Sequence, residues 1–114
     1  GFLSIAVLNL NNMRDRLSDT RAKKNTLAVF LGPKKSKFYH FFLIVGALVA
    51  SLLFFHFTNT YLWSVVACVV FIPLGKHLAY VAQNESPALL DPELKKVALA
   101  TFFFSVLFTL GFLF

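Results

Sequence analysis

The sequence predicts an all-α fold, a multi-pass transmembrane helix bundle. Of its 114 residues, 58% are hydrophobic and only 14% are charged, whereas soluble domains carry about 25% charged residues. The mean hydropathy of +0.72 points the same way. A chain of this length has too little interior to hide so much apolar surface from water, and the same composition excludes a disordered chain. We therefore expect an integral membrane protein or a part of one.

Three apolar runs are long enough to cross a bilayer, which takes roughly 20 helical residues. The first, residues 38–57, contains no Asp, Glu, Lys or Arg. The second, residues 61–82, contains Pro73, which predicts a kink near one end of the span. The third, residues 97–114, carries no charge. The sequence thus predicts three spans.

The chain also starts with an apolar segment, residues 1–10, that is about half as long as a span requires. We expect the last turns of a helix there, followed by a polar motif loop that extends to residue 37. Before the last span, Asp91 and Pro92 fit a helix N-cap and a first helical position. Residues 1–114 are then the C-terminal portion of one transmembrane domain.

The basic residues predict how the chain is oriented. Eight of the eleven Lys and Arg lie between the half-span and the first full span, and the other three flank residues 83–96. The connection Thr58–Thr60 has none. By the positive-inside rule, residues 13–37 and 83–96 face the cytoplasm. Topology, with some attraction to anionic lipid, explains the net charge of +6, so the expected partner is the lipid bilayer and no nucleic acid.

The polar segment after the half-span is the best candidate for chemistry. If the helix continues past Leu10, Asn11, Asp15 and Asp19 are spaced i, i+4, i+8 and lie on one face, each about 6 Å from the next. Two carboxylates stacked in this way repel each other. They become useful when Mg²⁺ lies between them and a phosphate-bearing ligand. The alternative is a solvated helix face with local ion pairs.

Neighbouring polar residues favour the metal–phosphate hypothesis. Asparagines close to a membrane boundary are costly unless they face a cavity or a polar ligand. Arginine can hold phosphate oxygens in bidentate fashion and lysine as a point charge. The residues in question are Asn9, Asn11, Asn12, Arg14, Arg21, Lys23 and Lys24.

Two stretches carry a family resemblance. The runs NNMRDxxSD (residues 11–19) and KNTLAVxLG (residues 24–32) resemble the second aspartate-rich motif of the UbiA superfamily of membrane prenyltransferases. The similarity extends over the spans that follow. It implies the C-terminal part of a fold of about nine helices in a bacterial inner membrane. It also implies transfer of a polyprenyl group from its diphosphate to an aromatic acid, in the most similar branch 1,4-dihydroxy-2-naphthoate in menaquinone biosynthesis.

The resemblance also implies residue roles in an Mg²⁺-dependent polyprenyltransferase. Asp15 and Asp19 would be the catalytic, metal-binding carboxylates. The family's other aspartate-rich motif does not occur in this sequence, so we expect half an active site that is inactive alone. Lys23 stands where the family usually has glycine, and the loop after Asp19 is expected to differ if that position needs a positive φ. The implied diphosphate-binding residues are Asn11, Asn12, Arg14, Arg21 and Lys24.

Two other classes of function stay open from the residues alone. CDP-alcohol phosphatidyltransferases also place two aspartates four residues apart, but their upstream Asp-Gly and Ala-Arg pairs are absent here. In a transporter or assembly subunit, the aspartates would form a cation or proton site. His40, His56 and His77 are not at metal-ligand spacing, and we expect them to pack or to form hydrogen bonds near the interfaces. Lys76 and His77 are expected to line a cavity mouth or to snorkel. The oligomeric state is left open.

Overall fold

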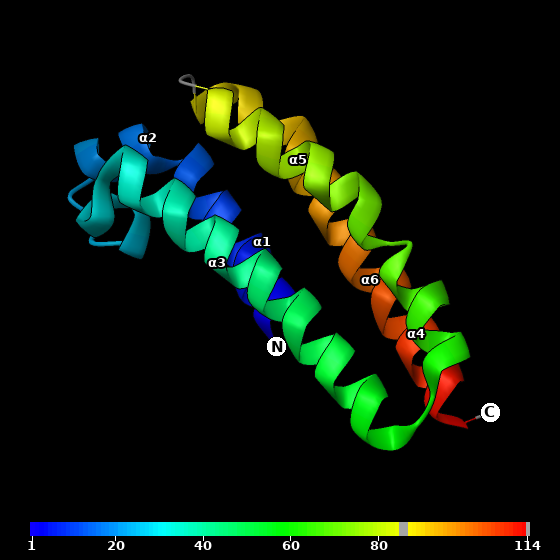
Figure 1. Cartoon of the computed structure of the whole chain (residues 1–114). Coiled ribbons are helices and arrows are strands. Elements are labelled where there is room, and N and C mark those ends of the chain that lie inside the picture. Colours follow the sequence, from blue (N-terminus) through cyan, green and yellow to red (C-terminus); the bar gives the residue numbers. More distant parts are fainter. Residues whose placement is uncertain (85–86, 114) are drawn as a thin grey trace.

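The fold is helical throughout the part of the chain that the computed structural model describes, residues 1–84 and 87–113 (Figure 1). This confirms the predicted all-α class. The elements in chain order are α1 (Phe2–Arg14), α2 (Arg16–Arg21), α3 (Leu27–Thr58), α4 (Tyr61–Cys68), α5 (Phe71–Gln83), the 3₁₀ turn η1 (Pro87–Leu90) and α6 (Asp91–Leu113).

The helices form an elongated bundle with principal extents of 49 × 21 × 19 Å. Figure 1 shows α1 beside the first half of α3, and α4 followed by α5 running back along α6. The helix α1 contacts both α3 and α6. It does so because one face, formed by Leu3, Ala6, Leu10 and Met13 at helical spacing, is apolar and buried.

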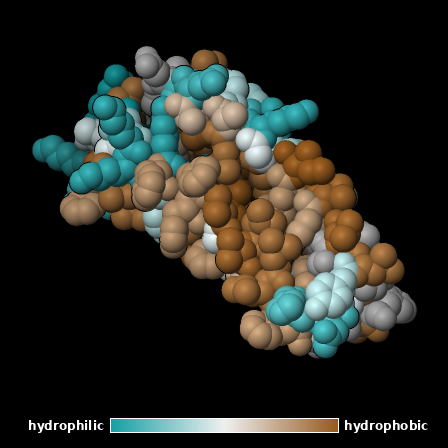
Figure 2. Space-filling view, in the orientation of Figure 1, coloured by the Kyte–Doolittle hydropathy of each residue, from teal (hydrophilic) through white to brown (hydrophobic). Residues whose placement is uncertain are grey.

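Among the residues that the structure describes, two helices, α3 and α6, are long and apolar enough to cross a membrane. With 23 residues, α6 is about 34 Å long, more than the roughly 30 Å of a bilayer's hydrocarbon core. On the face shown in Figure 2, a hydrophobic middle separates hydrophilic groups at the two ends of the bundle. The helix α6 begins at Asp91, where the sequence predicts a helix start.

The predicted motif loop up to residue 37 is wrong in part, because most of it is helical. The helix α3 already begins at Leu27, capped by Thr26, whose Oγ1 accepts a hydrogen bond from the Val29 N–H at 3.3 Å. A kink at Gly32 separates this first turn from the long segment that follows. Gly32 has φ 79° and ψ 178°, a conformation open essentially only to glycine. The buried Ser36 hydroxyl donates to the Gly32 carbonyl at 2.6 Å and supports the kink.

The predicted span 61–82 is a broken helix. The helices α4 and α5 are separate, and neither is long enough to span a membrane alone. Pro73 has no N–H to donate to Val69, and its ring crowds the carbonyl four residues earlier. The Ile72 N–H instead bonds the Val69 carbonyl three residues back, at 3.2 Å. The predicted kink therefore exists, but it lies at residues 69–70, near the middle of the segment.

A series of hydrogen-bonded polar side chains links α3, α5 and α6. The Glu93 carboxylate accepts hydrogen bonds from Lys96 Nζ at 2.9 Å and from His77 Nδ1 at 2.7 Å. With its proton on Nδ1, a neutral His77 presents Nε2 as an acceptor to His40 Nε2–H at 2.7 Å. His40 Nδ1 is then a buried acceptor without a partner in the described part of the chain. Because these hydrogen bonds join the three helices, they fix the register of the helices relative to one another.

We predict that Glu93→Ala lowers the free energy of unfolding by about 1–3 kcal/mol, because it leaves the buried His77 N–H unpaired. Lys96→Ala is the matched control, since it removes the exposed end of the same network and should cost less than about 1 kcal/mol. Thermal unfolding of the full-length protein in detergent measures both. Equal losses in the two variants would contradict the assigned role.

Candidate functional site

The three polar residues spaced four apart do lie on successive turns. The helix α1 ends at Arg14, and Asp15 (φ −93°, ψ 6°) joins it to α2. The helical hydrogen-bond pattern nevertheless continues across this joint. The Asp15 N–H donates to the Asn11 carbonyl at 3.1 Å, and the Asp19 N–H donates to the Asp15 carbonyl at 2.8 Å. The backbone thus stacks Asn11, Asp15 and Asp19 one turn apart, as the spacing predicts.

Arg14 is the electrostatic centre of this motif. Its Nε and Nη2 donate to the two Asp15 carboxylate oxygens at 3.0 and 3.2 Å. Nη2 also donates to Asn11 Oδ1 at 2.7 Å, and Nη1 donates to Asp91 Oδ1 at 2.8 Å. The hydrogen bonds with Asp15 and then Asp91 raise the pKa of Arg14 above its usual value. The guanidinium therefore holds Asp15 in place and ties the end of α1 to the start of α6.

These contacts leave Arg14 little capacity for a ligand. A guanidinium has five N–H donors, and four are engaged with Asn11, Asp15 and Asp91. The arrangement fits a positioning role for Arg14 better than the direct diphosphate contact that the family resemblance implies. Asp15, with 37% of its side chain exposed, remains open on its outer side.

The acidic face points away from the helices of this chain. In an α-helix, residues two apart lie about half a turn from each other, so Asp15 lies opposite the buried Met13. The face of α1 that packs on α3 and α6 is thus opposite the one that carries Asn11 and Asp15. The described residues do not enclose this face. A cavity of about 300 Å³ at the same end of the bundle is lined instead by residues that include Arg16, Lys34 and Lys37.

The turn after Asp19 has a backbone conformation that suits glycine, the residue that the resembling family usually has at the position of Lys23. Lys23 has φ 59°, a left-handed conformation that glycine adopts most easily. The Lys23 N–H donates to the Thr20 carbonyl at 3.2 Å, and the Lys24 N–H donates to the Asp19 carbonyl at 2.8 Å. This pair of bonds is a Schellman motif. Lysine thus keeps a positive φ at this position, and the Lys24 backbone stays bonded to the turn at Asp19.

The other predicted site residues lie around this turn. Asp19 and Asn12 are half-buried, while Arg21 and Lys24 are exposed near the end of α2. Asn9 has a structural role instead. It is buried, and its Nδ2 donates to the Ser36 carbonyl at 3.3 Å, which attaches α1 to the kinked part of α3.

Sequence reasoning missed two long-range arrangements. Asp91 joins the motif through Arg14, although 77 positions separate the two residues. His77 is buried between His40 and Glu93, so neither the cavity mouth nor snorkelling describes it. His56, by contrast, forms the expected hydrogen bond near a bundle end, to the Tyr61 hydroxyl at 3.3 Å. The only available signal was a set of ionisable residues inside or beside apolar runs.

The donor set of the motif suits a hard cation but does not complete a site. Two carboxylates and an amide oxygen are the oxygen ligands that Mg²⁺ takes, and it usually adds substrate phosphates and water. Within residues 1–84 and 87–113, no group of three or more His, Cys, Asp or Glu is arranged to hold a metal ion. Further ligands would have to come from a bound phosphate or from elsewhere in the protein.

Comparison with known proteins supports the resemblance. Residues 1–107 match the UbiA prenyltransferase family. The chain is 39% identical to a 1,4-dihydroxy-2-naphthoate octaprenyltransferase of Haemophilus influenzae over 99% of its length, and 37% identical to the Escherichia coli enzyme of the same name over 97%. It spans only 37% and 36% of those two relatives. No solved structure matches the chain.

We predict that Lys23→Val lowers the free energy of unfolding by about 1–2 kcal/mol, because a β-branched side chain is strained at positive φ. Lys23→Gly should leave it unchanged within about 0.5 kcal/mol or raise it. Thermal unfolding of the full-length protein in detergent measures both variants, with Lys24→Val as the neighbouring control. A similar loss from valine and from glycine would show that the left-handed turn does not form.

Proposed function

Because the chain belongs to the UbiA prenyltransferase family, we propose that its α1–α2 motif forms half of a prenyl diphosphate site in a membrane-embedded prenyltransferase. The whole protein would transfer a polyprenyl group from its diphosphate to 1,4-dihydroxy-2-naphthoate in menaquinone biosynthesis. Its two curated relatives named above carry that acceptor in their names. The observation that carries the proposal is the stack of Asn11, Asp15 and Asp19 on an open helix face.

The shape of the open face supports an amphiphilic substrate. One turn before Asn11 and Asn12 along α1, on the same side as Asp15, Leu8 is 59% exposed. The face thus changes from carboxylates to apolar side chains as it runs from α2 toward the middle of the bundle. A polyprenyl diphosphate has the same division, with a charged head and a hydrocarbon tail. The tail would lie along α1 while the head lies beside Asp15 and Asp19.

Each residue of the motif then has a defined task. Asp15 and Asp19 would hold Mg²⁺, with Asn11 oriented by Arg14 one turn before Asp15. The exposed Arg21 and Lys24 contact diphosphate oxygens, and Asn12 contributes a further polar contact. Arg14 holds the Asp15 carboxylate in position. Bound Mg²⁺ supplies charge neutralisation to the leaving diphosphate, which favours breaking of the allylic C–O bond.

The remaining ligands would come from outside these residues. A site built for a diphosphate and its cations needs more donors than Asp15 and Asp19 provide. We expect the rest of the enzyme to face them across a cavity that excludes water from the allylic cation. The distribution of basic residues supports a motif on the cytoplasmic side of a bacterial inner membrane.

The two alternative functions have weaker support. A phosphatidyltransferase role leaves the match of residues 1–107 to a prenyltransferase family unexplained. A transport or assembly role leaves the match over residues 1–107 unexplained.

We predict that Asp15→Asn or Asp19→Asn in the full-length enzyme lowers the rate of prenyl transfer by at least about 100-fold, because each removes a metal-binding charge. The control is Asp91→Asn, the same chemical change at a carboxylate that pairs with Arg14 outside the Asn11–Asp15–Asp19 stack, and it should lower the rate less than about tenfold. Rates are measured with a prenyl diphosphate and the naphthoate acceptor in detergent. Near-full activity of both motif variants would exclude the assigned roles.

We also predict that removal of divalent cations with EDTA abolishes prenyl transfer and that added Mg²⁺ restores it. The Arg14→Gln variant should need a several-fold higher Mg²⁺ concentration for half-maximal rate, because Asp15 is no longer held in place. A titration of rate against Mg²⁺ measures this shift. An unchanged titration curve would mean that Arg14 does not position the metal site.

A further inference from the structure

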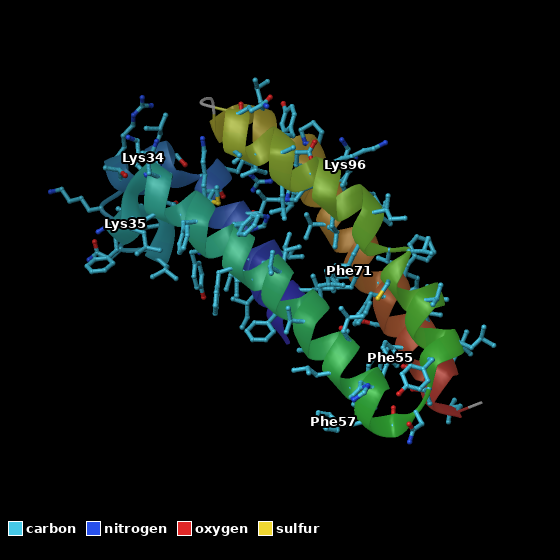
Figure 3. All side chains as sticks on the ribbon, viewed as in Figure 1. Lys34, Lys35, Phe55, Phe57, Phe71 and Lys96 are labelled. Carbon is cyan, nitrogen blue, oxygen red and sulfur yellow. The ribbon has the colours of Figure 1, made fainter. Side chains whose placement is uncertain are left out.

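A second feature of the basic end is the cavity between the start of α3 and the end of α5. Its volume is about 300 Å³. Arg16 of α2 and Lys34 and Lys37 of α3 line it, and the described lining residues include no acidic side chain. Figure 3 shows Lys34 at this end of the bundle, where α2 and the start of α3 meet. The cavity therefore concentrates positive charge between helices.

One of these cations is held in place. Lys37 Nζ donates a hydrogen bond to the Asn84 carbonyl at the end of α5, so its ammonium spans from α3 to α5 across the cavity. Lys34 is exposed and Arg16 half-buried, and both can turn toward a ligand. A bound anion would meet one fixed donor and two adjustable ones.

The rest of the lining is apolar and lies at the edge of the hydrophobic surface. Met13, Pro33 and Leu90 form the apolar part of the wall. On α3, Phe30 and Phe38 are 83% and 75% exposed on either side of the basic residues. The apolar span follows directly after Lys37. The cavity thus lies where the basic start of α3 gives way to its apolar part.

The cavity is separate from the acidic face. Met13, which lines it, is buried against the other helices, whereas Asp15 lies about half a turn away on the open side of the motif. Arg16 is the nearest connection between the two, since it lies one turn before Asp19.

We propose that this interhelical cavity binds the phosphate headgroup of an anionic phospholipid. Basic pockets between transmembrane helices recognise such headgroups through lysine and arginine. The headgroup phosphate lies between Arg16, Lys34 and Lys37, and the acyl chains pass over the apolar wall to the exposed phenylalanines. The site goes beyond the prenyl transfer proposed above and uses none of its residues.

The test measures lipid binding to the full-length protein by native mass spectrometry, with phosphatidylglycerol and phosphatidylcholine as probes. We expect phosphatidylglycerol to bind one site at least about tenfold more tightly than phosphatidylcholine. The variant Lys34→Gln/Lys37→Gln should lose about tenfold in that affinity. So should Arg16→Gln/Lys34→Gln, which keeps the Lys37–Asn84 bond and guards against a merely structural effect.

The matched control is Lys35→Gln/Lys95→Gln, which removes two exposed lysines outside the cavity lining and should change the affinity less than about twofold. An equal loss in this control, or no preference for the anionic lipid, overturns the proposal.

Millimolar inorganic phosphate or pyrophosphate should not displace the lipid, and displacement would assign the cavity to a soluble anion. The KM for the prenyl diphosphate should stay within twofold in the cavity variants. A rise in KM that accompanies the loss of lipid affinity would make the cavity part of the substrate site. The lipid-binding result does not depend on whether Asp15 and Asp19 support prenyl transfer.

Discussion

The rest of the structure depends on one constraint, the need of α1 to bury a single apolar face. Leu3, Ala6, Leu10 and Met13 fill the space between α3 and α6, and burial of such side chains is worth about 1.5–3 kcal/mol each for the larger ones. Because a helix turns about 100° per residue, this packing sends Asn11 and Asp15 to the opposite side. The apolar core thus decides where the acidic face points, and substitutions in the core would act on the site by rotating α1.

Arg14 links the packed helix α1 to the charged residues of the motif and of α6. Two carboxylates one turn apart repel each other, and a third, Asp91, begins the last helix. One guanidinium that bridges Asp15 and Asp91 offsets part of this repulsion and joins helices that are distant in sequence. A metal ion at Asp15 and Asp19 would add positive charge beside Arg14. Arg14 thus offsets part of the carboxylate charge without a ligand, and a cation at Asp15 and Asp19 would offset more of it.

Local features of the fold and site could be predicted from the sequence, and long-range contacts could not. Helical spacing places Asp15 and Asp19 on adjacent turns whatever surrounds them, and Pro73 breaks its helix by removing a backbone donor. The left-handed turn at Lys23 could not be predicted from this residue, because lysine does not favour a positive φ. The His40–His77 contact depends on the register of α3 against α5, which the sequence leaves undetermined for residues 37 positions apart. The same holds for the Arg14–Asp91 pair.

At the basic end of the bundle, acidic and basic side chains lie on different helix faces. Arg16 lies between the acidic face and the cavity, and Lys34 and Lys37, which follow the kink at Gly32, line the cavity wall. A straight α3 would carry its first turn in line with the apolar span and would not fold it back beside α2. The glycine is thus needed for more than the turn itself. By folding the first turn of α3 back beside α2, Gly32 shapes the end of the bundle that carries both the acidic face and the basic cavity.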